Sequence, residues 1–282
     1  MSPSPAVPRE TYLAGKGQEE WMQRHLRQRS GDQWAAFLLP HLRPGLRMLD
    51  CGCGPGTITS DLALRVDPGE VVGIDADAKV VEVARAAAVE RGQRNVSFEV
   101  GDVYALPFLD CSFDVVFANT LVMHLRQPLV ALREMFRVLK PGGVAGVSDL
   151  DMSTWAHAPE EPAIRIFQEI AIRLLEKGGG SPCYAPSIRK MLIEAGFTGV
   201  EGGALAIPLG TAEKLRTLLP LFDQIARMPG ALEMVGGAAA KLGATAMELI
   251  DRMRTWAGRP DAFFTRVHCT GLGWKPGPDA AR

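Results

Sequence analysis

The sequence lacks several features that would assign it to a specialised class of protein. Its 282 residues include only five cysteines, an odd and sparse set, whereas small secreted domains carry dense, even-numbered disulfide frameworks. Free thiols are therefore expected. Cys51 and Cys53 form a close pair, but a zinc site needs four ligands and no second pair follows at a recognisable spacing. The sequence predicts neither a disulfide scaffold nor a metal site.

Long apolar runs and charge of one sign are also missing. No stretch approaches the ~18 apolar residues of a membrane span, and the proline-rich start, MSPSPAVPRE, lacks the hydrophobic segment of a signal peptide. The 31 basic and 32 acidic side chains are interspersed, with no basic run of five. These absences disfavour nucleic-acid binding and membrane insertion and predict a cytoplasmic globular protein, with the oligomeric state left open.

What the sequence does contain is a regular alternation of strand and helix signals from about residue 46 onward. Short apolar segments predict seven strands, at 46–51, 71–75, 96–100, 113–119, 144–150, 200–207 and 263–272. Amphipathic segments between them predict helices, at 56–65, 77–91, 128–140 and 187–195. Strands separated by helices favour an α/β fold with a doubly wound, mostly parallel, seven-stranded sheet.

Three regions follow from this alternation. Residues 1–45 are expected to form an N-terminal helical cap, and residues 46–158 the core that binds a cofactor. Residues 159–282 would complete the sheet, with helical insertions at 159–180 and 211–258. Because such insertions lie beyond the ligand-binding edge of an open sheet, we expect them to form a lid over an acceptor pocket.

Polar residues follow the first five strands in register. They are Asp50, Asp75, Asp102, Asn119 and Asp149, one at or near the carboxyl end of each strand. Aspartate and asparagine favour the turns after strands, which would explain any one of them. Five in register are better explained by a ligand site, because open α/β sheets bind ligands at this edge.

A glycine-rich loop, Asp50-Cys51-Gly52-Cys53-Gly54-Pro55-Gly56, joins the first strand to the first helix of this core. Its backbone N–H groups, at a helix N-terminus, are expected to face an anionic group of a ligand. The spacing is G-x-G-x-G, and Thr57 stands where the dinucleotide-binding pattern needs its third glycine. Asp75 is the expected acceptor for two ribose hydroxyls, which an NAD-dependent enzyme would also possess.

Taken together, these motifs resemble a class I S-adenosylmethionine-dependent methyltransferase, closest to the UbiE-like small-molecule group. The resemblance is carried by the glycine loop, by Asp75 after VVGI, by Gly101-Asp102-Val103 with Leu106-Pro107-Phe108, by FDVVFAN, and by LREMFRVLKPGG at 132–143. It covers residues 46–150 densely and implies the Rossmann-like methyltransferase fold. It also implies S-adenosylmethionine as cofactor and S-adenosylhomocysteine as product.

The resemblance implies roles for individual residues. Asp50, Gly52 and Gly54 would lie beside the methionine moiety, Asp75 would bind the ribose, and Asn119 would flank the sulfonium. The adenine would meet Ala76, Gly101, Asp102 and the N–H of Val103, and Tyr12 is the candidate for an aromatic residue that closes over the cofactor. His124 matches a histidine common in the group, for which burial under the cofactor is favoured over a role as catalytic base.

The acceptor and the reacting atom stay open at this stage. Asp149 is the candidate general base, although an aspartate there could instead cap the following turn. Asn119 and Thr120 do not start the motif of nucleic-acid base methyltransferases, so a small apolar, aromatic or quinone-like acceptor is favoured, methylated on C, N or O without a metal. The alternatives are an NAD(P)-dependent oxidoreductase and a domain that binds S-adenosylmethionine without catalysis.

Overall fold

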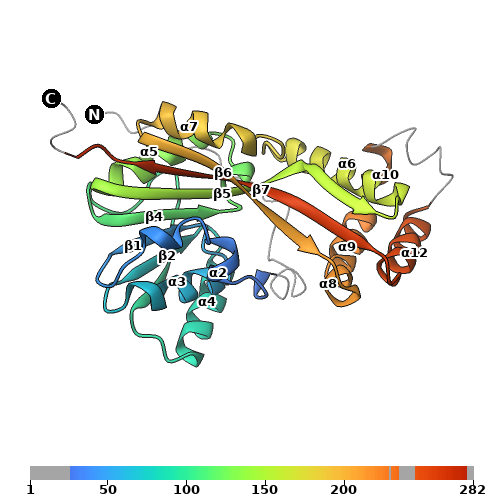
Figure 1. Cartoon of the computed structure of the whole chain (residues 1–282), viewed down its shortest axis with the longest axis horizontal. Helices are drawn as coiled ribbons and strands as arrows, with labels where there is room; N and C mark the ends of the chain where they lie inside the picture. Colours follow the sequence, from blue (N-terminus) through green and yellow to red (C-terminus); the bar gives the residue numbers. More distant parts are fainter. Residues whose placement is uncertain (1–25, 229, 235–244, 278–282) are drawn as a thin grey trace.

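The computed structural model describes residues 26–228, 230–234 and 245–277, which form a seven-stranded sheet with helices on both faces (Figure 1). The strands are β1 Met48–Cys51, β2 Val71–Asp75, β3 Val96–Val100, β4 Phe113–Asn119, β5 Leu139–Ala158, β6 Thr198–Leu209 and β7 Phe263–Trp274. Their order is β3-β2-β1-β4-β5-β7-β6, and only the pairings of β7 are antiparallel. The predicted doubly wound, mostly parallel sheet is confirmed.

Helices from the alternating units cover the two faces of the sheet. On one face, α5 (Pro128–Val138) and α7 (Ile188–Ala195) pack on a core that includes Val116 and Val147. The other face is covered by α2 (Gly31–Trp34), α3 (Thr57–Val66) and α4 (Ala78–Glu90), whose buried side chains include Trp34, Leu62 and Val81. The remaining turns of this part are the 3₁₀ segments η1 (Leu39–His41), η2 (Val122–His124) and η3 (Ala185–Ser187).

The fifth strand is much longer than the sequence predicts. We expected it to end at 150, but β5 runs on to Ala158 and pairs with β7 along most of its length. Asp149 therefore lies in the middle of a strand, and the expectation that it follows the strand is wrong. The strand continues because β7 supplies backbone partners for residues 156–158, a long-range contact that no local pattern announces.

A second helical layer lies beyond the carboxyl ends of the parallel strands. It consists of α6 (Pro162–Lys177), α8 (Ala212–Arg216), α9 (Leu219–Arg227), α10 (Ala231–Met234) and α12 (Ala246–Ala257). In Figure 1 these helices gather where β5, β6 and β7 extend past the rest of the sheet. They share an apolar core with the strands, in which Phe167, Phe222 and Phe264 are almost fully buried. Among the described helices, none has both the length and the hydropathy to cross a membrane.

Candidate active site

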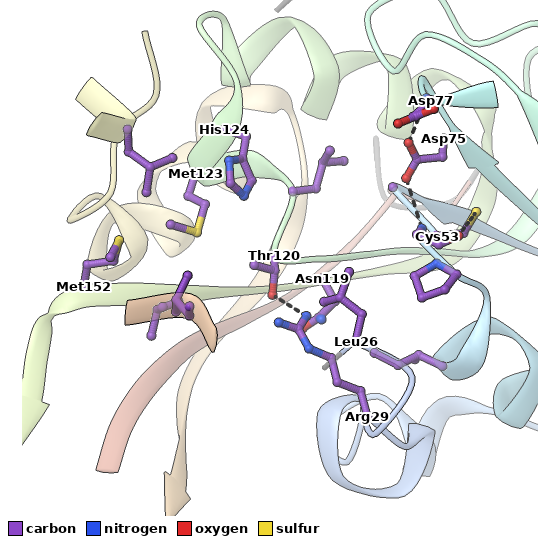
Figure 2. A pocket seen from close by; sticks show the side chains of 18 of the residues that line it. Leu26, Arg29, Cys53, Asp75, Asp77, Asn119, Thr120, Met123, His124 and Met152 are labelled. Carbon is purple, nitrogen blue, oxygen red and sulfur yellow. Dashed lines mark hydrogen bonds between the residues drawn. The ribbon is translucent and has the colours of Figure 1, made fainter. Parts of the chain in front are cut away.

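A cavity of about 250 Å³ lies between the glycine loop and the second helical layer (Figure 2). One end is bounded by Gly52, Gly54, Asp50, Asp75 and Asp77, and the middle by Asn119 and Thr120. The far end is mostly apolar, with walls from β5 and from helices α6 and α9; they include Leu150, Met152, Trp155, Leu175, Ile225 and Met228. Asp50, Gly52, Gly54, Asp75, Asn119 and His124, predicted from sequence, thus come together around one cavity.

The glycine loop is closed by hydrogen bonds within the protein. The N–H groups of Gly52 and Cys53 both donate to the carbonyl of Ile74, and the N–H of Gly54 donates to Asp75 Oδ2 at 3.0 Å. Gly56 N–H donates to Cys53 O, and Pro55 has no N–H. The expectation that these N–H groups face an anionic ligand is wrong for residues 52–56, because β2 and the loop itself already take them.

Gly56 has a separate, steric role at the start of α3. Its φ is +77°, and a Cβ there would lie 2.6 Å from Cζ of Phe98 and 2.9 Å from Cβ of Ala84. Gly54, with φ of +54°, has no heavy atom within 4 Å of such a Cβ. Gly56 therefore allows the loop to pack on β3 and α4, whereas the space beside Gly54 is open.

Asp75 ends β2 and points toward the loop (Figure 2). Besides the bond from Gly54, its Oδ1 accepts from the N–H of Asp77 at 3.0 Å. Burial raises the pKa of this carboxyl, and the two backbone donors oppose that shift. Each carboxylate oxygen has capacity for a further donor, such as a ligand hydroxyl.

Two further polar side chains on the cavity wall are buried. Asp50 is 2% exposed and accepts from Thr59 Oγ1 at 2.6 Å, and burial raises its pKa to about 7. Asn119, at the end of β4, is 8% exposed, and its Oδ1 has no hydrogen-bond partner among the described residues. A buried acceptor of this kind is costly unless a ligand or water supplies the donor.

Asp149 is fully buried behind the cavity wall instead of lining the cavity. Its Oδ2 accepts from the N–H of Val122 at 2.8 Å and from the hydroxyl of Tyr184 at 2.8 Å, with a longer bond from the N–H of Met123. Burial raises its pKa to about 7. The carboxylate thereby holds turn η2, which places His124 on the cavity (Figure 2). Burial, with a contribution from Arg29, lowers the pKa of His124 to about 4.

Two arginines on the cavity wall were not anticipated from the sequence. Arg29 donates through Nη1 to Thr120 Oγ1 at 3.2 Å (Figure 2). Its guanidinium also lies over the ring of Trp34. Arg266, in β7, is 7% exposed and lines the cavity. The sequence did contain a sign of Arg266. Arg266, His268 and Thr270 alternate along β7 and lie on its buried face, where apolar residues are usual, so polar residues with this spacing mark the strand as unusual.

The residues expected around an adenine ring lie at the neighbouring strand ends. Gly101, Asp102 and Val103 follow β3, and the N–H of Gly101 donates to the carbonyl of Asp75 at 3.0 Å. Asp102 is exposed and caps its own turn through the N–H of Tyr104. Among the described residues that line the cavity, these three and Ala76 are absent. Tyr12 lies outside the described residues.

The sequence of the chain is similar to those of known methyltransferases. A family model described as a methyltransferase domain matches residues 42–179. The chain is 31% identical over 268 residues to "Probable methyltransferase ltbC" of Aspergillus luteorubrus, covering 88% of this chain and 92% of that one. It is 40% identical over 115 residues to demethylmenaquinone methyltransferase of Lactococcus lactis, covering 40% of this chain and 46% of that one.

A similarity of fold accompanies these similarities of sequence. The YcgJ protein of Bacillus subtilis superposes with a TM-score of 0.57 at 23% identity, covering 86% of this chain and 98% of that one. At that identity the likeness concerns the fold alone. The matched region of the family model contains the glycine loop, Asp75, Asn119 and His124, all of which line the cavity.

Proposed function

The chain belongs to the class I S-adenosylmethionine-dependent methyltransferases, and on that premise we propose that it binds S-adenosylmethionine at the glycine loop and methylates a small molecule held under the helical layer. The observation that carries this proposal is the single cavity that joins the loop and Asp75 to the apolar walls of β5, α6 and α9. The cavity therefore has a cofactor end and an acceptor end that open into each other.

The near end of the cavity fits this cofactor. Open space beside Gly54 admits a ligand close to the backbone, and Asp75 can accept from ribose hydroxyls. The unpartnered Oδ1 of Asn119 can accept from the ammonium of the methionine moiety. Three carboxyls, those of Asp50, Asp75 and Asp77, border this end, which suits a cation better than an anion.

The same geometry disfavours the nicotinamide alternative. Dinucleotide-binding proteins cradle a pyrophosphate with the N–H groups of this loop. Here the N–H groups of Gly52, Cys53, Gly54 and Gly56 are bonded to protein oxygens, and the acceptor of the Gly54 N–H is the carboxylate of Asp75. A pyrophosphate would therefore meet a carboxylate and few free donors.

For Ala76, Gly101, Asp102 and Val103 we propose contacts with the adenine. They follow strands β2 and β3, which pair in register so that Val100 lies opposite Asp75. Their position next to the ribose acceptor supports this assignment, in which the adenine would lie at the rim of the cavity. Tyr12 remains a candidate for covering the cofactor.

The protein's main contribution to the reaction is to position the acceptor. When bound, S-adenosylmethionine supplies a methyl group activated by its sulfonium, so that the acceptor gains the methyl and the electron pair of the broken bond stays on sulfur. Met152 and Trp155 of β5 and Leu175 of α6 provide the surfaces that hold an acceptor in line. Positioning of this kind can contribute ~7–11 kcal/mol to lowering a barrier.

For proton transfer we propose His124 as the group that meets the acceptor and Asp149 as the residue that positions it. His124 lines the cavity, and its imidazole is neutral at pH 7; because burial lowers its pKa to about 4, it is a weak base and suits an acceptor that releases its proton readily on methylation. Asp149 is removed from the cavity, but its hydrogen bonds to η2 orient the turn that carries His124.

The experiment that tests the function is isothermal titration calorimetry of the purified protein with S-adenosylmethionine, S-adenosylhomocysteine, NAD and NADP. We expect binding of the first two only. Asp75→Ala is expected to weaken that binding by about 1–3 kcal/mol, because a charged acceptor of two hydroxyls is lost. Asp67→Ala, an exposed aspartate after α3, serves as the control and is expected to bind like the wild type.

Binding of NAD or NADP alone would overturn the cofactor assignment. Equal affinity of the wild type and Asp75→Ala for S-adenosylhomocysteine would refute the role of Asp75. With the cofactor established, acceptors are screened by mass spectrometry for a gain of one methylene, which separates an enzyme from a domain that only binds the cofactor.

A further inference from the structure

Arg266 is a buried cation without a buried counter-ion. It is 7% exposed, it lines the cavity, and its Nε has no hydrogen-bond partner among the described residues. Many surface arginines of this protein are paired with a carboxylate, as in Arg227 with Asp223 at 2.7 Å and Arg259 with Asp261 at 2.9 Å. Burying an unpaired guanidinium is costly, so its presence calls for an anion that the described chain does not provide.

The acidic residues nearest along the sheet are engaged elsewhere. Asp151 accepts from the N–H and hydroxyl of Ser153, and its charge acts on the thiols of Cys183 and Cys269. Asp149 is bonded to η2 and to Tyr184, and its charge acts on Arg29. Burial alone lowers the pKa of Arg266, to about 10, with no carboxylate raising it.

The position of Arg266 places this charge at the acceptor end. Asp151 pairs with Val267 and Ala156 with Thr265, so the β5 residues 152–155 form a bulge opposite Arg266. The bulge is fastened by the N–H of Val267, which donates to Thr154 Oγ1 at 3.0 Å. Met152 and Trp155, the two cavity residues of the bulge, therefore lie across the strand pair from the guanidinium.

Arg29 adds a second cation to the wall of the same cavity. Burial, and after it the charge of Arg266, lowers the pKa of Arg29 to about 9. Both line the cavity, and both lower the pKa of the neutral, buried His268. The cavity is thus acidic at the glycine loop, and its cations lie at the middle, where Arg29 bonds to Thr120, and opposite the β5 bulge, where Arg266 lies.

We propose that Arg266, with Arg29 on the wall of the same cavity, binds a carboxylate of the methyl acceptor, which makes the acceptor an apolar organic acid. The planar guanidinium matches the two oxygens of a carboxylate, and the walls formed by Trp155, Met152 and Ile225 suit an apolar body. This inference rests on the proposed function, because it takes the opposite end of the cavity as the cofactor site.

The test uses pairs of probes that differ in charge but hardly in shape. Benzoate and benzamide, and 2-naphthoate and 2-naphthamide, are titrated calorimetrically into the full-length protein saturated with S-adenosylhomocysteine. We expect each acid to bind at least tenfold more tightly than its amide. The preference should disappear in Arg266→Gln and persist in Arg216→Gln, a control that removes an exposed arginine of α8 and the same net charge.

Three results of these titrations would overturn the inference. The first is the absence of a preference for the acids in the wild-type protein. The second is tighter binding of 2-naphthyl phosphate than of 2-naphthoate, which would make the site a phosphate site. The third is an affinity of Arg266→Gln that falls for S-adenosylhomocysteine but not for methylthioadenosine, because Arg266 would then bind the carboxylate of the cofactor. If S-adenosylhomocysteine does not bind to the wild type at all, the proposed function itself fails.

A readout without any ligand separates a binding role from a structural one. Because an unpaired buried charge destabilises the free protein, Arg266→Met is expected to melt at or above the temperature of the wild type, by up to about 2–4 °C. A lower melting temperature would mean that the guanidinium stabilises the fold, which would also overturn the proposal.

Discussion

The carboxylate of Asp149 connects two parts of the cavity wall. It accepts hydrogen bonds from the backbone of η2 and from Tyr184, which precedes η3. The charge of the same residue also acts on Arg29. At the scale of single residues, the chemistry of this site thus depends on groups that never meet the acceptor.

A substitution series at Asp149 tests this role. Asp149→Ala leaves three donors without an acceptor and should lower the free energy of unfolding by about 2–4 kcal/mol, measured by urea denaturation. Asp149→Asn retains one oxygen acceptor and should cost under about 1 kcal/mol. Once an acceptor is known, Asp149→Asn should retain turnover, because an amide can hold the turn but cannot take a proton. Loss of turnover with normal stability would restore Asp149 as the base.

The elements of the site differ in how tightly they are packed. The glycine loop is held by β2 on one side and by Phe98 and Ala84 on the other, so its backbone path is determined before any ligand arrives. The β5 bulge is held by the hydroxyl of Thr154 and by the carboxylate of Asp151. Both elements are rigid supports for groups that border the cavity.

Two glycine substitutions separate steric contact from backbone strain in the loop. Gly56 and Gly92 both have positive φ, but a Cβ at Gly92 meets no atom within 4 Å. We expect Gly92→Ala to cost about 1–2 kcal/mol for its left-handed conformation. Gly56→Ala should cost a further 1–3 kcal/mol or so, because the new methyl overpacks Phe98 and Ala84. Equal losses in urea denaturation would show that this contact is unimportant.

At the scale of the whole molecule, charge is sorted along one cavity. Asp50, Asp75 and Asp77 border the loop end, whereas Arg29 bonds to Thr120 at the middle of the cavity and Arg266 lies opposite the β5 bulge. A cationic cofactor and an anionic acceptor would each meet side chains of the opposite charge. The separation of these charges along the cavity would direct each ligand to its own end. The buried groups also couple the stability of the fold to pH.

Buried acids and buried histidines act on stability in opposite directions. Burial raises the pKa of Asp50 and Asp149 to about 7, so the folded protein holds these protons more tightly, and their contribution to stability falls as pH rises from about 4 to 7. Burial lowers the pKa of His124 to about 4 and of His268 to about 2, so their contribution falls as pH drops below about 6.5. Burial also raises the pKa of Asp75 and lowers the pKa of His157, so these groups act on stability in the same two directions.

The two effects should largely cancel in the wild type between pH 4.5 and 6.5. Asp50→Asn removes one acid and should therefore lose roughly 2 kcal/mol of unfolding free energy relative to the wild type over that fall in pH. His268→Asn removes one histidine and should gain a similar amount over the same fall. Urea denaturation at the two pH values measures both. Parallel pH profiles for the wild type and the two variants would contradict the burial of these groups in their neutral forms.

The local features of this protein were readable from its sequence. The seven strands, their helices and the parallel sheet follow from short apolar runs and from periodicity, which depend on neighbouring residues. The glycine loop, Asp50, Asp75 and Asn119 were also recognisable, because polar residues after buried strands share one edge of the sheet.

Contacts between distant segments decided the rest. β5 runs through Asp149 to Ala158 because β7, more than a hundred residues later, pairs with it, and this pairing moves Asp149 from a strand end into the core. The loop lost its free N–H groups to the carbonyl of Ile74 and the carboxylate of Asp75. Arg29 and Arg266, 237 positions apart by number, meet at one cavity because the α2 segment and β7 pack together through Trp34 and His268. A local pattern carries no record of such contacts, since their energy comes from burial in the assembled fold.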